Sequence, residues 1–183
     1  MKRIKLAMVR KDISDIPQYS LPAGFRLRFF EKGDEENWAR IETSVGEFKD
    51  EKIALARFEN EFGIRIDEMA ERCLFIENEH GEVIATTTAW YGNLDGFGEG
   101  LGRIHWVGVV PEYQGRKLSK PLLSEAMNIL ASHHSKAYLT SQTTSYQAVN
   151  MYLNYGFEPF LTRPTCDEAW ALMEKILKRK IIK

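Results

Sequence analysis

The stretch from residue 104 to residue 130 constrains the fold of this chain more than any other. It reads IHWVGVVPEYQGRKLSKPLLSEAMNIL: an apolar run that ends at Pro111, a polar turn that contains Arg116 and Lys117, and an apolar stripe at helical spacing. A strand, a basic turn and a helix in this order present free backbone N–H groups and two cations to an anion. Taken alone, the stretch fits a phosphate site and an ordinary strand–turn–helix equally well.

Two residues fix the local structure of this stretch. Gly108 interrupts a run that is otherwise apolar on both faces, so it predicts a bulge in an inner strand, or the close approach of another backbone or a ligand. Pro121 has no N–H and is tolerated only in the first turn of a helix, so the helix must begin between Gly115 and Pro121. A P-loop is excluded, because no GxxxxGK followed by Ser or Thr is present.

Size and composition are those of one ordinary globular domain. The chain has 183 residues, of which 44% are hydrophobic and 28% charged. With 25 basic and 26 acidic residues the net charge is −1, so we expect no general attraction to nucleic acid or to a membrane, and any phosphate binding must be local. The first apolar run is too short for a signal peptide and no run approaches membrane-spanning length, so a cytoplasmic protein is expected.

Neither the cysteines nor the paired histidines predict a metal or a disulfide. Cys73 and Cys166 form no CxxC pair, and we expect both to be reduced and buried or partly buried. His133 and His134 have no matching cluster of ligands, so a solvated helix end is expected and no metal is predicted.

Hydrophobic periodicity predicts an alternation of strands and helices. Strands are expected at 24–30, 73–77, 82–91, 104–110, 137–141 and 157–161, and helices at 34–45, 53–63, from the basic turn to 133, at 145–155 and at 166–180. Asp34 is the expected N-cap of the first helix. The apolar run 4–9 is either an edge strand or a packed arm. The five glycines of 92–102 predict a mobile hairpin loop.

Several aromatic residues lie in the first two predicted helices and the link between them. We expect Trp38, Phe58 and Phe62 to pack these helices against a sheet, whereas Phe48 is open between packing and a ligand pocket.

Two motifs resemble those of the GCN5-related N-acetyltransferase superfamily. VGVVPEYQGRKLSKPLL resembles its strand followed by Gln/Arg-x-x-Gly-x-Gly/Ala at the start of a helix, with Gln114 at the leading position and Lys117 and Ser119 at the two small-residue positions. Lys117 departs from the preferred glycine, and it either weakens phosphate binding or adds a cation.

The second motif is the family's Asn-x-x-Ala-x-x-x-Tyr-x-x-x-Gly-Phe. This chain carries Ser145, Ala148, Tyr152, Gly156 and Phe157 at those spacings. The predicted order of elements is also the family's.

The resemblance implies an α/β (α+β) fold with a mixed, mostly antiparallel sheet of six to seven strands flanked by helices. It covers a common core of about 24–161 within one domain of 1–183. An N-terminal segment, 1–23, and an extra C-terminal helix, about 166–180, lie outside that core.

The resemblance further implies acetyl transfer from acetyl-coenzyme A to a primary amine of a small molecule or peptide, by direct attack in a ternary complex. The amides of the turn would bind the cofactor's pyrophosphate. Besides the backbone of the β-strand residues named below, the residues expected to bind the cofactor are Gln114, Gly115, Arg116, Lys117, Leu118, Ser119 and Ser145. The backbone of Val107 and Val109 would bind pantetheine in the cleft that the family opens between its fourth and fifth strands, and an N–H near Val109 would stabilise the oxyanion.

Acid–base roles follow from the same resemblance. Tyr152 matches the family's usual proton donor to the leaving thiolate. His105 stands where one member carries a histidine, and its competitors as general base are Glu47 and ordered water. The expected walls of the acceptor site are Glu47, Phe48, Trp90, Tyr91 and the loop 92–102. Carboxylates suit a cationic amine and aromatic rings suit an apolar amine, so these residues do not identify the acceptor. The sequence also leaves open whether the protein is a monomer or a homodimer.

Two alternatives stay open. The departures from the motifs at Lys117 and Ser145 keep open a catalytically silent acyl-coenzyme A-binding module that senses the ligand or holds a partner. The other alternative is a domain that shares the fold and binds another phosphate ligand.

Overall fold

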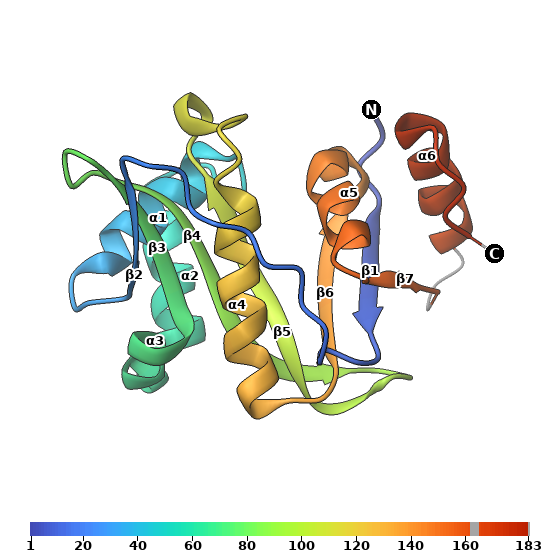
Figure 1. Cartoon of the computed structure of the whole chain (residues 1–183), viewed down its shortest axis with the longest axis horizontal. Helices are drawn as coiled ribbons and strands as arrows, with labels where there is room; N and C mark the ends of the chain where they lie inside the picture. Colours follow the sequence, from blue (N-terminus) through green and yellow to red (C-terminus); the bar gives the residue numbers. More distant parts are fainter. Residues whose placement is uncertain (162–164, 183) are drawn as a thin grey trace. The chain divides into compact units, whose positions relative to one another are not determined.

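The structure, a computed structural model, describes residues 1–161 and 165–182 (Figure 1). In chain order its elements are β1 (Lys5–Arg10), β2 (Phe25–Phe29), α1 (Asp34–Ser44), α2 (Glu51–Phe62), η1 (Gly63–Arg65), α3 (Ile66–Arg72), β3 (Cys73–Asn78), β4 (Val83–Leu94), β5 (Gly98–Val109), η2 (Pro111–Tyr113), α4 (Ser119–His133), β6 (Ala137–Gln142), η3 (Thr143–Ser145), α5 (Tyr146–Asn154), β7 (Glu158–Phe160) and α6 (Cys166–Leu177), where η marks a 3-10 helix.

The strands form one mixed sheet in the order β2-β3-β4-β5-β6-β1-β7. β5 and β6 pair in parallel, with Gly102 opposite Ala137 and Arg103 opposite Tyr138. The pairs β2/β3, β3/β4, β1/β6 and β1/β7 are antiparallel. The predicted fold, a mostly antiparallel sheet of six to seven strands with flanking helices and an extra C-terminal helix, is confirmed.

The chain divides into two compact units. The first unit comprises Met1–Pro17, Tyr91–Arg103 and Ala131–Lys183, and the second comprises Gln18–Trp90 and Ile104–Leu130. Within the second unit, α4 lies in front of the strands in Figure 1 and α1, α2 and α3 lie behind them. Within the first unit, α5 and α6 contact each other, and α6 also contacts β1.

The N-terminal run is an inner strand, so both predicted alternatives, edge strand and packed arm, are wrong. β1 pairs with β6 on one side and β7 on the other. Its residues Leu6 to Arg10 are all buried. A strand covered on both faces shows a continuous apolar run instead of an alternation, which is the pattern that Leu6 to Val9 have.

The glycine-rich segment is mostly strand, which corrects the predicted loop. β4 extends to Leu94 and β5 begins at Gly98, which leaves a short turn in which the Phe97 N–H donates to the Leu94 carbonyl at 2.9 Å. Leu101 is buried in a cluster with Val9 and Tyr138. The glycines permit the positive φ angles of this hairpin, and the apolar side chains between them hold it in place.

The start of α1 differs from expectation. Gly33 is the N-cap of α1, and Asp34 is the first helical residue. The Asp34 carboxylate instead accepts the Glu31 N–H at 2.7 Å and two hydrogen bonds from Arg28, because a buried acid requires partners.

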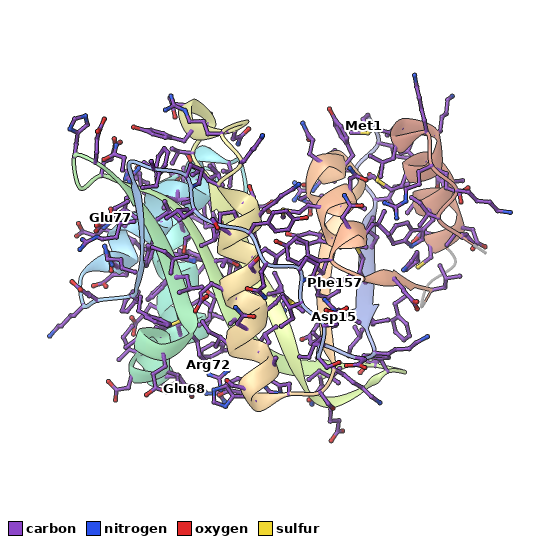
Figure 2. The ribbon with its side chains drawn as sticks, viewed as in Figure 1. Met1, Asp15, Glu68, Arg72, Glu77 and Phe157 are labelled. Atoms are coloured by element: carbon purple, nitrogen blue, oxygen red, sulfur yellow. The ribbon has the colours of Figure 1, made fainter. Side chains whose placement is uncertain are left out.

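The short helix α3 was not predicted. Arg72 at its end donates to the Ala89 carbonyl of β4 at 3.2 Å and pairs with Glu68 at 3.7 Å; Figure 2 labels both charged residues. Its seven residues bury one side chain, Met69, which is too little for a periodic signal.

The other boundaries agree with the sequence. α4 begins at Ser119, within the predicted limits, and Gly156 follows α5 with φ of 77°. Both cysteines are free and buried. Among the described residues, no helix has the length and apolar character to cross a membrane.

Candidate active site

The turn between β5 and α4 presents its basic residues to solvent. Gly115, Arg116 and Lys117 are exposed, and Leu118 is buried and anchors the turn to the core. The Arg116 guanidinium lies 4.6 Å from the centre of the Tyr113 ring. The turn therefore carries two cations directly before the helix, where the first N–H groups lack partners within the helix.

The backbone of the turn explains the motif position that Lys117 occupies. Lys117 has φ of 64°, in the left-handed region, where glycine is the least strained residue. Gln114 Nε2 donates to the Val109 carbonyl at 2.9 Å and so ties the turn back to the end of β5. The leading Gln of the motif thus has a structural contact of its own.

Gly108 is approached closely by α1. A Cβ atom on Gly108 would lie 2.8 Å from Ile41 Cγ2 and 3.0 Å from Glu42 Oε1. The close approach predicted for this glycine is therefore present, but the neighbours are helix side chains. The irregular backbone of the strand lies two residues earlier, at Trp106, whose φ is 50°.

His105 and Trp106 both contact one carboxylate of α2. The ring nitrogen His105 Nε2 hydrogen-bonds to Glu61 Oε1, and Trp106 Nε1 donates to Glu61 Oε2 at 3.2 Å. Arg57, one turn earlier on α2, places its Nε 3.1 Å from the same Oε2. Glu61 therefore links His105, a predicted general base, to helix α2.

The charge state of Glu61 follows from these contacts. Burial disfavours its ionised form, but the hydrogen bond and charge of His105, the charge of Arg57 and the Trp106 N–H outweigh burial and lower the pKa of Glu61 to about 2. Glu61 is a carboxylate at neutral pH.

Sequence reasoning missed Glu61. It lies 44 residues before His105 and belongs to no spaced motif. A helical carboxylate that follows a basic residue at i+4 is an ordinary surface pattern, so the sequence carries no signal that would have identified it.

The predicted acceptor residues divide between the two units. In the second unit, the Phe48 ring lies 5.3 Å from Trp106 and Trp90 lies 5.0 Å from Phe62. The Glu47 N–H donates to the Glu42 carbonyl at 3.0 Å in the link between α1 and α2. Tyr91 belongs to the first unit.

The three aromatic residues expected to pack are in the core. Trp38, Phe58 and Phe62 are buried and contact one another edge to face, which confirms that prediction. Phe48 joins the edge of this cluster and is half-buried, and Trp38 lies 5.8 Å from it.

The second motif lies in the first unit. Tyr152 is 6% exposed on α5, and its ring lies 6.2 Å from Phe157. Ser145 is the N-cap of α5, and its hydroxyl contacts Gln142 Nε2 at 3.1 Å.

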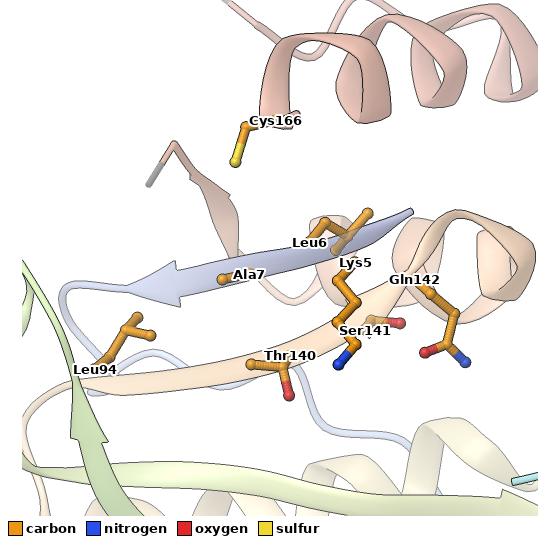
Figure 3. Close-up of a pocket in the computed structure, with 8 residues that line it drawn as sticks. All are labelled: Lys5, Leu6, Ala7, Leu94, Thr140, Ser141, Gln142 and Cys166. Carbon is orange, nitrogen blue, oxygen red and sulfur yellow. The ribbon is translucent and has the colours of Figure 1, made fainter. Parts of the chain in front are cut away.

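The first unit also contains a cavity of about 260 Å³. Its lining includes Lys5 of β1, Thr140 and Gln142 of β6, and Cys166 at the start of α6 (Figure 3). Leu94, which belongs to the predicted wall segment 92–102, also lines this cavity, whereas Lys5, Thr140, Gln142 and Cys166 were not among the sequence-predicted site residues.

Comparison with known proteins identifies the family. The sequence profile of the Acetyltransferase (GNAT) family matches residues 29–157. No curated protein matches. Among solved structures, the chain is similar to a GCN5-related N-acetyltransferase from Sphaerobacter thermophilus, with a TM-score of 0.68 and 20% identity over 86% of this chain and 49% of that one. It is also similar to a GCN5-related N-acetyltransferase from Kribbella flavida, with a TM-score of 0.55 and 18% identity over 86% and 55% of the two chains.

A third similar structure is a tandem GNAT protein from the clavulanic acid biosynthesis pathway, with a TM-score of 0.59 and 13% identity over 85% of this chain and 50% of that one. The chain thus spans about half the length of these three proteins, and at such identities the likeness shows the fold. Because the profile match covers more than half of the 183 residues, the chain belongs to the acetyltransferase (GNAT) family.

Proposed function

We propose that this protein transfers an acetyl group from acetyl-coenzyme A to a primary amine of a small molecule or peptide. The observation that carries the proposal is the β5–α4 turn, an exposed segment with two cations at the start of a fifteen-residue helix. A pyrophosphate is the anion that suits adjacent N–H groups and two separate cations.

Binding of the cofactor would use the turn and the end of β5. The N–H groups from Gly115 to Ser119 would bind the pyrophosphate, with Arg116 and Lys117 adding charge. The backbone of Val107 and Val109 would bind the pantetheine arm, and a β5 N–H near Val109 would bind the oxyanion. Ser145, the N-cap of α5, is the remaining residue that we assign to the cofactor.

The chemistry needs one base and one acid. In our proposal the acceptor ammonium gives a proton to His105, and the amine lone pair attacks the thioester carbonyl. When the tetrahedral intermediate collapses, the C–S bond breaks and Tyr152 protonates the thiolate, while the nitrogen loses its second proton, which returns to the Tyr152 oxygen through water. Phe48 and the half-buried Trp106, which lie against each other near His105, support an acceptor with an apolar part. Glu47, Trp90 and Tyr91 complete the proposed walls.

Ligand binding tests the first half of this proposal. We expect coenzyme A and acetyl-coenzyme A to raise the melting temperature and ATP to leave it unchanged, because ATP lacks pantetheine. Stabilisation by ATP alone would contradict the proposal. Incubation with a panel of amines, monitored by the release of free thiol, tests acetyl transfer. The Tyr152→Phe variant should lower turnover about 10- to 100-fold. Binding of acetyl-coenzyme A without acetylation of any amine would favour the silent module.

The Lys117→Gly variant tests how the lysine that replaces the family's glycine affects stability and affinity for coenzyme A. Glycine relieves the left-handed backbone but removes a cation, so we expect unchanged or higher stability and coenzyme A affinity lowered by about 3- to 10-fold. Lys178→Gly is the matched control, since Lys178 is also left-handed, with φ of 49°, and lies at the end of α6. Tighter binding by Lys117→Gly would show that the lysine opposes the phosphate.

A further inference from the structure

We propose that Glu61 is a positioning residue for His105: it holds the imidazole as the tautomer with hydrogen on Nε2, so that Nδ1 is the nitrogen that takes the proton of the acceptor amine. This inference rests on the proposed function and adds to it a residue that belongs to neither family motif.

Contacts on both oxygens hold the Glu61 carboxylate. Oε1 contacts His105 Nε2, while Oε2 accepts from Trp106 Nε1 at 3.2 Å and pairs with Arg57 Nε at 3.1 Å. A carboxylate bound through both oxygens cannot rotate without losing a partner. The side chains of His105 and Glu61 are 9% and 18% exposed, so little water competes for these contacts.

The tautomer follows from the charge of the partner. The contacts with Arg57 and the Trp106 N–H favour an ionised Glu61, and an ionised carboxylate only accepts hydrogen bonds. The hydrogen of a neutral His105 therefore lies on Nε2, and the lone pair lies on Nδ1. When Nδ1 takes a proton, the new positive charge is stabilised by the carboxylate across the ring.

The backbone of β5 is irregular at Trp106, and this irregularity allows the arrangement. Neighbouring residues in a regular strand point to opposite faces of the sheet. His105 and Trp106 are neighbours, yet both contact the same carboxylate, and their ring centres are 4.8 Å apart. The left-handed φ of Trp106 makes this shared contact geometrically accessible, and such a backbone persists only where its surroundings hold it.

The other elements around the pair contribute uncharged rings. Phe62 of α2 lies 6.2 Å from His105 and 5.0 Å from Trp90 of β4, and Trp38 of α1 lies 5.4 Å from Trp106. Arg57 is the charged group that α2 adds, and it also lies 5.9 Å from the Trp106 ring centre. The imidazole and the carboxylate therefore interact across an environment of low polarity, where coupling between them is strong.

Nitrogen NMR of the intact chain tests the tautomer without any assay of activity. The chain has four histidines, and His105→Gln assigns the signal of His105. We expect the wild type to give the pattern of hydrogen on Nε2, and Glu61→Gln to give a mixture of tautomers. Hydrogen on Nδ1 in the wild type would overturn the inference.

Kinetics separate positioning from a merely structural role. For Glu61→Gln we expect kcat to fall about 10- to 100-fold with KM for acetyl-coenzyme A unchanged. The acid limb of the pH profile should move to lower pH, because the imidazolium loses its carboxylate. Glu61→Asp keeps the charge and should keep more activity. Glu59→Gln, an exposed carboxylate on the same helix, is the control and should behave as wild type.

The outcomes distinguish the two proposals. If the wild type acetylates no amine but shows hydrogen on Nε2, the proposed function fails and the tautomer assignment stands. If the wild type is active and Glu61→Gln has the wild-type pH profile, the function stands and the positioning role is overturned. Should Glu61→Gln fail to fold, Glu61→Asp and the wild-type spectrum still decide.

Discussion

Two glutamates on the helix pair of the second unit have opposite surroundings. Glu61 of α2 has an imidazole, an indole N–H and a guanidinium against its carboxylate. Glu42 of α1 is 1% exposed and, among the described residues, neither of its carboxylate oxygens has a hydrogen-bond partner. Burial, with the nearby negative charge of Glu47, raises the pKa of Glu42 to about 8.

The difference teaches that partners, and not burial, set the charge of an acid. Burial is the largest single influence on both groups and acts in the same direction on both. Glu61 overcomes it through three partners, whereas Glu42 keeps its proton at neutral pH. The paired acid supplies fixed negative charge to His105, and the unpaired acid is a neutral group packed against Gly108.

The two acids also affect stability with opposite signs. Unfolded Glu42 loses its proton near 4.5 and native Glu42 near 8, so between these values the native state binds one more proton and the free energy of unfolding falls as pH rises. For Glu61 the native pKa is the lower one, so its contribution is present above 4.5 and is lost as pH falls towards 2.

Gly108→Ala should have the largest destabilising effect. The new methyl group would lie within 3.0 Å of Ile41 and Glu42, both held by the core, so we expect the free energy of unfolding to fall by about 2–3 kcal/mol in urea titrations. Gly63→Ala is the matched control, because its methyl group meets only the flexible end of exposed Glu59. Equal stability of the two variants would show that the contact between α1 and β5 is loose.

The sequence predicted the elements that carry their own signal. The strand, the turn and the helix of 104–130 agree because Pro111, Pro121 and the apolar stripe each restrict the backbone locally. β1 was misassigned because a strand's neighbours are set by pairing with β6 and β7, which lie far along the chain. The hairpin after Gly92 was misread because composition alone does not reveal that Leu101 is buried.

In the candidate site, too, the sequence predicted residues of local motifs and missed residues whose role depends on distant contacts. The motif identified the turn, and the left-handed Lys117 gives the physical reason for the family's glycine there. Glu61 was out of reach because its role depends on a contact made across 44 residues and on the φ of Trp106. Glu42 was equally hidden, since a glutamate in an amphipathic helix is ordinarily solvated.

The Glu42→Gln variant tests whether the buried Glu42 is protonated at neutral pH. Gln has the same shape and does not titrate, so we expect the variant to be more stable than wild type by about 4 kcal/mol at pH 8 and by about 1 kcal/mol at pH 5. The wild type should lose about 1.4 kcal/mol per pH unit from Glu42 between pH 5.5 and 7.5, and the variant should not. Unfolding in urea at several pH values measures this. Parallel pH profiles of the two proteins would mean that Glu42 is ionised and has a partner.

Trp106→Phe should have the smallest effect. It tests whether the Trp106 N–H helps to keep Glu61 ionised. Phenylalanine keeps the ring and removes one donor to Glu61, the weakest of the influences that lower the pKa of that acid. We expect stability at pH 7 to fall by about 1 kcal/mol and acid unfolding to begin at higher pH, because Glu61 binds its proton more readily. Trp38→Phe is the matched control: its indole belongs to the same aromatic cluster, and Trp38 Nε1 has no partner among the described residues. It should change packing and leave the acid midpoint where it is. If both variants shift that midpoint equally, the shift comes from packing, and the Trp106 N–H does not help to hold Glu61 ionised.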